Sequence, residues 1–362
     1  MSRLDRFLVQ MVERKASDLH LSAGEPVRMR VQGQLLSFGE NTISGDALTE
    51  LMQEICSEEQ WNLFNATREL DFSYSLPGVN RFRCNFLQQV RGPGAVFRMI
   101  PQNIIPLEQI GLPSSVGALS ELKSGLILIT GPSGSGKSTI VSSLIDAINK
   151  RATRHIITIE DPIEHVHKSH KSVIVQREVG IHTKSVSQGI KDALTQDPNV
   201  LVVGDLTTAE RIKLAATAAE MGILVIGTLH TSSAAKTIER LVEYFPPAQK
   251  DEIQGIIAEC LTAIISGQLL THKKGVGRVL AAEILRDEPG LASLILESAY
   301  SKVTSFIDTH RSSGMQTLDF HLQQLVEKNL VHAEEALLKS NNRRQFEQWI
   351  IQTGLSAKSG PG

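Results

Sequence analysis

The sequence reads LILITGPSGSGKST from residue 126 to residue 139. The stretch contains the pattern G-x-x-x-x-G-K-[ST], with an apolar run before it and a helical pattern after it. Glycines at such a turn let backbone N–H groups point inward around phosphate oxygens, and the following helix directs its positive end toward them. The sequence therefore predicts a phosphate-binding loop between a strand and a helix. Its members are Gly131, Pro132, Ser133, Gly134, Ser135, Gly136, Lys137, Ser138 and Thr139.

Two side chains of this loop carry specific chemistry. We expect the ammonium of Lys137 to reach the β- and γ-phosphates of a nucleotide and the hydroxyl of Ser138 to bind Mg²⁺. A glycine-rich turn beside a surface lysine would show the same letters. The flanking strand and helix patterns favour nucleotide binding over that alternative.

Three further apolar runs also end abruptly in polar residues. They are HIITI (155–159), NVLVVG (199–204) and ILVIGTL (223–229). Helical patterns separate the runs, including residues 207–222, which start with threonines and end with a glycine. Buried continuous strands that alternate with helices predict an α/β fold with a parallel sheet covered on both faces. Ligands of such sheets bind at the carboxyl ends of the strands.

Four polar side chains after these strands are candidate catalytic residues. Glu160 and Glu164 can orient Mg²⁺ through water or accept the proton of an attacking water. Asp205 is predicted to hold Mg²⁺, directly or through water, and His230 follows the last run at the same sheet edge. Alone, such acids are more often helix caps or solvated turns, and such a histidine often only donates to a carbonyl. The phosphate-binding loop makes the catalytic interpretation the favoured one.

The first hundred residues follow a different pattern. Apolar residues at helical spacing predict an opening amphipathic helix, and short alternating segments predict strands in a mixed α+β domain. The segments are 18–22, 27–36, 71–76, 80–90 and 94–100. Residues 101–115 carry three prolines and a glycine without a clear period, so we place a linker there and a domain boundary near residue 110.

From about residue 246 onward the pattern is helical and predicts packed C-terminal helices. We expect an N-terminal domain at 1–108, a nucleotide-binding core at 109–280 and a C-terminal helical subdomain at 281–350. Residues 351–362 are predicted to be a disordered tail.

Composition excludes several classes of protein. The formal net charge is −2, with no run of five or six Lys or Arg, so binding of nucleic acid is disfavoured. Three scattered cysteines provide neither a disulfide framework nor a cysteine zinc site. The charged opening does not resemble a signal peptide, and no apolar stretch reaches the roughly 18 to 20 residues that span a bilayer. We therefore expect a cytoplasmic protein.

Seven segments, in one order, resemble the PilT family of type IV pilus retraction ATPases. They are ASDLHLS (16–22), RFRCNFLQQVRGPGAVFRMIP (81–101), GPSGSGKST (131–139), TIEDPIEHVH (158–167), DPNVLVVGD (197–205), GTLHTSSAAKTIERLVEYFP (227–246) and GMQTLD (314–319). The resemblance extends from about residue 5 to residue 335. Related extension and secretion ATPases carry a four-cysteine zinc module, which this chain cannot build, so retraction is favoured over extension.

The resemblance implies an N-terminal PAS-like domain, a RecA-like P-loop core and a homo-hexameric ring that binds ATP or ADP with Mg²⁺. It implies that Arg81, Arg83 and Arg98 reach the nucleotide phosphates, a role that suits the fixed charge and fork geometry of a guanidinium. Without the family, these arginines would be polar positions on an exposed sheet face. The resemblance further implies twitching motility, a location at the cytoplasmic face of the inner membrane at the pilus base, and an inner-membrane platform protein as partner.

The sequence departs from the family at three signature stretches. The family reads G-E-[MI]-R-D where this chain has residues 204–208, GDLTT, and T-G-H where it has residues 221–223, MGI. Residues 291–295, LASLI, lack the Arg-Asn pair of the family's AIRNLI-type motif. These departures predict a divergent paralogue that works alone or beside a second PilT-type ATPase.

Two hypotheses of function follow. In the first, the chain is an ATP-hydrolysing motor that powers pilus retraction, with activity altered by Asp205. In the second, it is a catalytically weakened nucleotide-binding ring subunit, an accessory to a standard retraction ATPase. A GTPase or a DNA translocase is disfavoured, because no N-K-x-D element follows the loop and no basic run exists.

Overall fold

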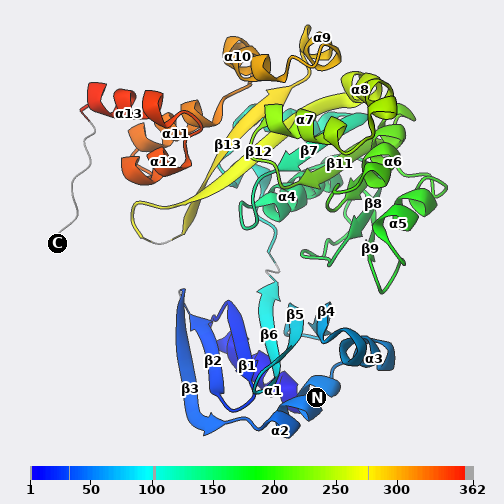
Figure 1. The fold of residues 1–362 in the computed structure, drawn as a ribbon, viewed down its shortest axis with the longest axis vertical. Helices are drawn as coiled ribbons and strands as arrows, with labels where there is room; N and C mark the ends of the chain where they lie inside the picture. The colour runs from blue at the N-terminus through cyan, green and yellow to red at the C-terminus, as the bar shows by residue number, and fades with distance from the viewer. Residues whose placement is uncertain (1, 32, 101–102, 276, 355–362) are drawn as a thin grey trace. The chain divides into compact units, whose positions relative to one another are not determined.

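The structure, a computed structural model, describes residues 2–31, 33–100, 103–275 and 277–354 (Figure 1). Its contacts divide the chain into two compact units. Unit 1 consists of Met1–Asn103 and Pro162–Val166, and unit 2 of Ile104–Asp161 and His167–Gly362. Each unit buries apolar side chains in a core of its own.

Unit 1 is built on a six-stranded antiparallel sheet with strand order β3-β2-β1-β6-β5-β4. The strands are β1 (Asp18–Ser22), β2 (Pro26–Val31), β3 (Gln34–Thr42), β4 (Glu69–Leu76), β5 (Asn80–Gln89) and β6 (Gly92–Ile100). Helices α1 (Arg3–Glu13), α2 (Gly45–Gln53) and α3 (Glu58–Thr67) complete the unit. The predicted opening helix and alternating strands are confirmed, except that the segment 27–36 is divided between β2, which ends at Val31, and β3, which begins at Gln34.

The alternation along the strands of unit 1 separates a core face from a polar face. On β5, Phe82, Cys84 and Phe86 are fully buried. Arg81 and Arg83, on either side of Phe82 in the sequence, are only half-buried. Successive side chains of a strand point to opposite faces, so residues 81 and 83 share the face opposite the aromatic core. The arginines singled out in the sequence therefore lie on the polar face of this sheet.

Unit 2 is built on a seven-stranded sheet with strand order β13-β12-β7-β11-β10-β8-β9. The strands are β7 (Gly125–Thr130), β8 (His155–Glu160), β9 (Val173–Glu178), β10 (Val200–Val203), β11 (Leu224–Leu229), β12 (Leu261–Thr271) and β13 (Arg278–Arg286). Neighbouring strands are parallel except for the pair β12 and β13. The four apolar runs predicted to be parallel strands are β7, β8, β10 and β11, which confirms that prediction.

Helices cover both faces of this sheet. On β7, Leu126 and Leu128 belong to one apolar core, with α5 (Val186–Ala193), α6 (Ala209–Glu220), α7 (Ala234–Glu243) and α8 (Pro247–Cys260). Ile127 and Ile129 belong to the opposite core, with α4 (Lys137–Arg151) and the short 3-10 helices at 107–109 and 114–121. A strand that is apolar at every position is buried on both faces, as the sequence predicts.

The helical prediction from residue 246 onward is wrong between residues 261 and 286. There the chain forms β12 and β13, so the predicted C-terminal helical subdomain at 281–350 begins inside a strand. The run around Ile264 and Ile265 is apolar at successive positions, and such a run does not distinguish a buried strand from a buried helix by its period. Pairing with β7 on one side and β13 on the other decides in favour of the strand.

The C-terminal helices follow β13. They are α9 (Leu291–Leu296), α10 (Val303–Thr309), α11 (Leu318–Glu327), α12 (Ala333–Lys339) and α13 (Arg343–Gln352). Because α13 includes residues 351 and 352, the predicted disordered tail does not begin at 351, and residues 355–362 lie outside the described residues. In the described part of the chain, no helix is both long and apolar enough to cross a membrane.

His321 on α11 is a buried histidine with a specific role in stability. Its side chain is almost fully enclosed, and its Nδ1 accepts the backbone N–H of Ala282 at 3.0 Å. Burial lowers the pKa of His321 to about 4, and Lys328 acts in the same direction. The folded protein therefore keeps this imidazole neutral at pH values where the unfolded chain binds a proton.

Acid is therefore expected to destabilise the fold through His321. Between about pH 6.5 and about pH 4 the unfolded chain binds the proton first, so stability falls as the pH falls, by up to roughly 3 kcal/mol. His321→Gln removes this dependence, and urea unfolding at a series of pH values measures it, with the exposed His332→Gln as control. An unchanged slope in His321→Gln contradicts the assignment.

Candidate functional site

The phosphate-binding loop lies where the sequence predicts it, between β7 and α4 of unit 2. Strand β7 ends at the buried Thr130, and α4 begins at Lys137, so the last three residues of the loop form the first turn of the helix. Gly136 precedes the helix with φ +93°, a left-handed conformation that favours glycine. The first N–H groups of α4 have no partner within the helix, so the helix start is suited to an anion.

Gly131 fits only because it has no side chain. Its φ is +143°, and a Cβ there would lie 2.5 Å from the carbonyl oxygen of Gly267 on β12 and 2.4 Å from Oγ of Ser135. Real Cβ atoms do not approach other atoms so closely. The backbone at Gly131, the first residue of the loop, therefore packs directly against the backbone of β12.

Gly131→Ala is expected to destabilise the protein by roughly 2 to 5 kcal/mol, because it adds both a clash and backbone strain. Nucleotide affinity should fall with it, since the loop must move away from β12. Chemical denaturation and nucleotide titration measure the two effects. Gly117→Ala is the matched control, because its Cβ would meet nothing within 4 Å. Equal stability of the two variants would contradict the packing described here.

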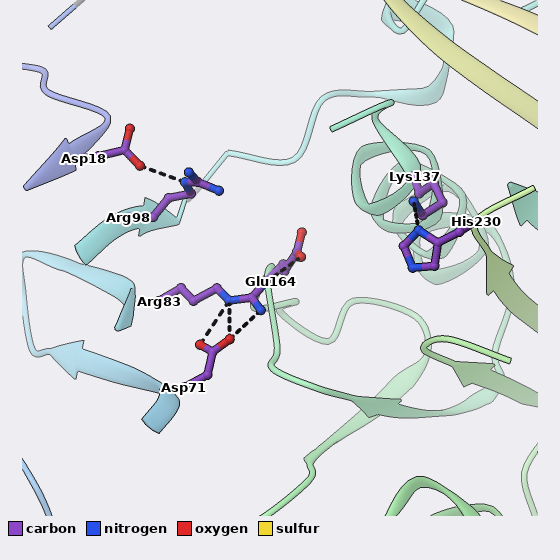
Figure 2. Close-up of polar contacts among 7 residues, drawn as sticks. All are labelled: Asp18, Asp71, Arg83, Arg98, Lys137, Glu164 and His230. Atoms are coloured by element: carbon purple, nitrogen blue, oxygen red, sulfur yellow. Dashed lines mark hydrogen bonds and ion pairs between the residues drawn. The ribbon is translucent and has the colours of Figure 1, made fainter. Parts of the chain in front are cut away.

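Lys137, His230 and Asp205 form a line of contacts at the loop. The Lys137 ammonium donates to the carbonyl oxygens of Gly131 at 2.8 Å and Pro132 at 3.1 Å. It also lies 3.3 Å from Nδ1 of His230 (Figure 2). An ammonium can only donate, so Nδ1 accepts and the imidazole proton belongs on Nε2. That Nε2 lies 3.1 Å from Oδ1 of Asp205.

Strand order explains why these residues meet. Asp205 follows β10 and His230 follows β11, and β11 lies in the sheet between β10 and the loop's own strand β7. Asp205 has φ +58°, a conformation that aspartate tolerates better than most residues, and its N–H donates to Oγ1 of Thr228 at 2.9 Å. The backbone itself thus aims this carboxylate toward His230.

The loop also offers a buried hydroxyl suited to a phosphate. Oγ of Ser135 is buried and has no hydrogen-bond partner among the described residues. Buried polar atoms are nearly always satisfied, so a phosphate oxygen fits this position. For Mg²⁺, the candidate ligands are Ser138, half-buried on the first turn of α4, and Asp205. Among the described residues there is no group of three or more His, Cys, Asp or Glu that could hold a metal ion.

Glu160 lies at the end of β8, and its carboxylate forms a hydrogen bond with Gln176 on the neighbouring strand β9. Its Oε1 accepts from Oγ1 of Thr158 at 2.6 Å and from Nε2 of Gln176 at 3.1 Å. In the sheet, β10 and β11 separate β8 from β7. At a spacing of about 4.8 Å between neighbouring strands, the two strands are roughly 14 Å apart. Its assignment as a residue that activates water stays a prediction.

The remaining predicted site residues, Arg81, Arg83, Arg98 and Glu164, belong to unit 1. Arg83 and Arg98 are direct partners across β5 and β6. Arg83 donates to Asp71 at 2.6 Å and lies 3.9 Å from Oε1 of Glu164 (Figure 2). Arg81 donates to Oγ of Ser73 at 2.5 Å. The structure thus groups the three arginines on one sheet face, and Glu164 with Arg83.

Two acidic partners of these arginines were not predicted from the sequence. Asp71 pairs with Arg83, and the buried Asp18 accepts from Nε of Arg98 at 2.8 Å (Figure 2). Burial acts to raise the pKa of Asp18, but hydrogen bonds from Arg98 and Ser17 outweigh it and hold the pKa below its usual value. Only the register of the antiparallel strands brings these residues together, and no short sequence motif encodes it.

Comparisons with known proteins show the family to which the chain belongs. Residues 1–356 match the family described as type II/IV secretion system protein. The chain is 44% identical over 331 residues to the type IV pilus retraction ATPase PilT of Pseudomonas aeruginosa, which covers 91% of this chain and 96% of that protein. It is 33% identical over 346 residues to the type IV pilus ATPase PilU of the same organism, with 96% and 91% covered.

A solved structure extends the comparison to the fold. The crystal structure of the pilus retraction motor PilT with bound ADP matches with a TM-score of 0.87 at 38% identity. The match covers 96% of this chain and 99% of that chain. The α/β fold with its parallel-rich sheet is therefore that of the PilT structure. The chain belongs to the type II/IV secretion system protein family and, within it, to the PilT-like type IV pilus retraction ATPases.

Proposed function

We propose that this protein hydrolyses ATP and uses the energy to retract type IV pili, the process that drives twitching motility. The observation that carries the proposal is the line from Lys137 through His230 to Asp205 at the phosphate-binding loop. These contacts bring together a cation that can bind phosphate (Lys137), a side chain that can form hydrogen bonds (His230) and a carboxylate that can bind a metal ion (Asp205). The 44% identity to a pilus retraction ATPase supports the choice of process.

Each residue of the site has a chemical task in this proposal. Loop N–H groups and Lys137 bind the phosphates and stabilise the charge that develops during transfer. Ser138 holds Mg²⁺ directly and Asp205 holds it directly or through water, and the bound ion neutralises phosphate charge. Nε2 of His230 lies 3.1 Å from Oδ1 of Asp205, so a small rotation of either side chain would let the imidazole orient that carboxylate. Glu160 and Glu164 are the candidates for accepting the proton of the attacking water.

The arginines of unit 1 suit contact with a nucleotide in a ring assembly. Arg98 has 71% of its side chain exposed and Arg83 has 39%, so both guanidinium groups are accessible in the single chain. We propose that Arg81, Arg83 and Arg98 stabilise phosphate charge, as arginine fingers do. An arginine on a separate unit completes the site only when the subunits close, which would couple hydrolysis to shape.

The finer architecture belongs to the same proposal. We infer a PAS-like N-terminal unit, a RecA-like core and a homo-hexameric ring. Its location is the cytoplasmic face of the inner membrane at the pilus base, with a platform protein of that membrane as partner. Nucleic acid is not a partner in this proposal, since the chain has a net charge of −2 and no basic run.

A second candidate function is that of a catalytically weakened ring subunit beside a standard motor. Asp205 favours it, because its carboxylate is one methylene shorter than the glutamate of the family pattern. Pseudomonas aeruginosa has both PilT and PilU, so one organism can hold two such proteins. If Asp205→Glu raises ATP turnover by orders of magnitude over an inactive parent protein, this second function is the correct one.

The proposed function is tested by deleting the gene and measuring pilus retraction and twitching. The wild-type gene should restore both, and the purified protein should hydrolyse ATP in a Mg²⁺-dependent reaction. If a variant that cannot hydrolyse ATP restores retraction and twitching, the role of the protein is structural and not that of a motor. If the purified protein hydrolyses ATP but deletion of its gene leaves pilus retraction unchanged, the protein is an ATPase that does not drive retraction.

A further inference from the structure

Glu283 is a buried carboxylate that lies outside the candidate site. It lies on β13, and only 2% of the residue is exposed. Its Oε1 accepts the backbone N–H of Ala234 at 2.6 Å, and the backbone of Leu318 lies close enough to the same carboxylate to lower its pKa. Burial raises the pKa of Glu283 to about 7, and the backbone groups of Ala234 and Leu318 act against that rise. A buried acid is costly to keep, so its partners point to its role.

Both partners of Glu283 are the first residues of helices. Helix α7 begins at Ala234 and α11 begins at Leu318. The first N–H groups of a helix lack partners within it, and the helix start carries partial positive charge. One carboxylate is therefore bonded to the start of α7 and lies beside the start of α11, two helices far apart in the sequence.

The first of these helices leads back to the candidate site. Only residues 231–233 separate His230 from α7, and Oγ1 of Thr231 is hydrogen-bonded at 2.7 Å to Oγ1 of Thr237 inside α7. The position of α7 therefore sets the position of His230. Glu283 is thus connected to the imidazole through one short, hydrogen-bonded segment.

A second connection runs to the phosphate-binding loop through the sheet. Glu283 lies directly opposite Ser266 in the pairing of β13 with β12. Oγ of Ser266 is hydrogen-bonded at 2.6 Å to Oγ1 of Thr130, the residue immediately before Gly131. All three of these polar residues are buried. A buried polar strip therefore extends from the loop's strand to β13.

The other helix leads to the C-terminal helices. Gln316, just before α11, forms a bridge to Ile284 on β13, and its Nε2 donates to the carbonyl oxygen of Ala282 at 2.9 Å. Helices α11, α12 and α13 share one apolar core. A displacement of α11 therefore carries the three helices with it.

We propose that Glu283 is a positioning residue that couples the His230 loop to helices α11–α13, so that a change at the nucleotide site is passed to these helices. The inference rests on the proposed ATPase function. Glu283 bonds the start of α7, and its neighbours Ala282 and Ile284 on β13 bond Gln316 just before α11, so β13 resists movement of one helix against the other. The carboxylate itself contacts no reacting group.

The test combines kinetics with hydrogen exchange in the full-length protein. Glu283→Gln keeps the shape but replaces one acceptor oxygen by a donor, so one helix start loses its bond. We expect kcat to fall at least about tenfold while KM for ATP changes little, because the site is misplaced rather than removed. ADP should alter amide exchange in residues 314–327 of the wild-type protein and leave it unaltered in the variant. Glu334→Gln, an exposed glutamate in the first turn of α12, is the matched control.

Combining Glu283→Gln with a second substitution, His230→Ala, shows whether Glu283 acts through His230. In a His230→Ala protein, Glu283→Gln should cause little further loss of kcat, since the positioned group is gone. A full further loss, or an unchanged exchange response in Glu283→Gln, would overturn the inference. If the variant does not fold, the wild-type exchange decides: a response to ADP in α7 without one in residues 314–327 also overturns it. Absence of ATP turnover in the wild-type protein would instead refute the proposed function.

Discussion

Lys137→Ala is expected to reduce ATP turnover by roughly 10²- to 10³-fold, the range found when a positioned donor to a developing charge is removed. The ammonium lies at the loop between two backbone carbonyls and the His230 imidazole, and the described residues place no other lysine at that position. A steady-state assay of released phosphate measures the loss. The same variant should fail to restore pilus retraction in a deletion strain.

Lys123→Ala serves as the control for this prediction. Lys123 is exposed just before β7, and its replacement removes the same charge from the same unit. Both variants should have the melting temperature of the wild-type protein. If Lys137→Ala keeps more than a tenth of wild-type turnover, the loop does not bind the transferred phosphoryl group in the way described.

Asp205→Asn should lower turnover by roughly 10²-fold and raise the Mg²⁺ concentration needed for half-maximal rate, because a metal-orienting carboxylate is lost. The substitution isolates charge from backbone effects. Asparagine tolerates positive φ as aspartate does, so the left-handed conformation of residue 205 is kept. Titration of Mg²⁺ at saturating ATP measures both quantities.

Asp197→Asn is the matched control for Asp205→Asn. Asp197 also has positive φ, at +52°, but it is exposed before the start of β10, whereas Asp205 follows the end of that strand. The control should leave turnover and Mg²⁺ dependence unchanged. Equal effects of the two substitutions would mean that the loss of turnover is not specific to the carboxylate of Asp205.

The parallel sheet and the loop could be predicted because their signals are local. Strands buried on both faces are apolar at every position, and the loop needs glycines at fixed spacing. Strand β12 could not be predicted, because an apolar run with Ile264 and Ile265 is compatible with either a buried helix or a buried strand. The decision depends on its partner β7, which lies far away in the sequence.

The sequence predicts which residues form the candidate site, but not which of them contact one another. That Asp205 and His230 follow adjacent strands depends on strand order, which periodicity does not encode. The partners of Arg83 and Arg98 depend on the register of β4, β5 and β1. Glu283 carried no signal, because a single acid inside an apolar strand pattern belongs to no motif. The roles of the predicted catalytic residues stay predictions.

The hydrogen bond between Thr130 and Ser266 joins residues 136 positions apart. At translation rates of about 5 to 20 residues per second, the ribosome synthesises the second partner on the order of 10 s after the first. Until then the loop's strand lacks the neighbour against which Gly131 is pressed. A nascent chain that ends before β12 is therefore expected to bind no nucleotide, so the newly made protein acquires this capacity only late in its synthesis.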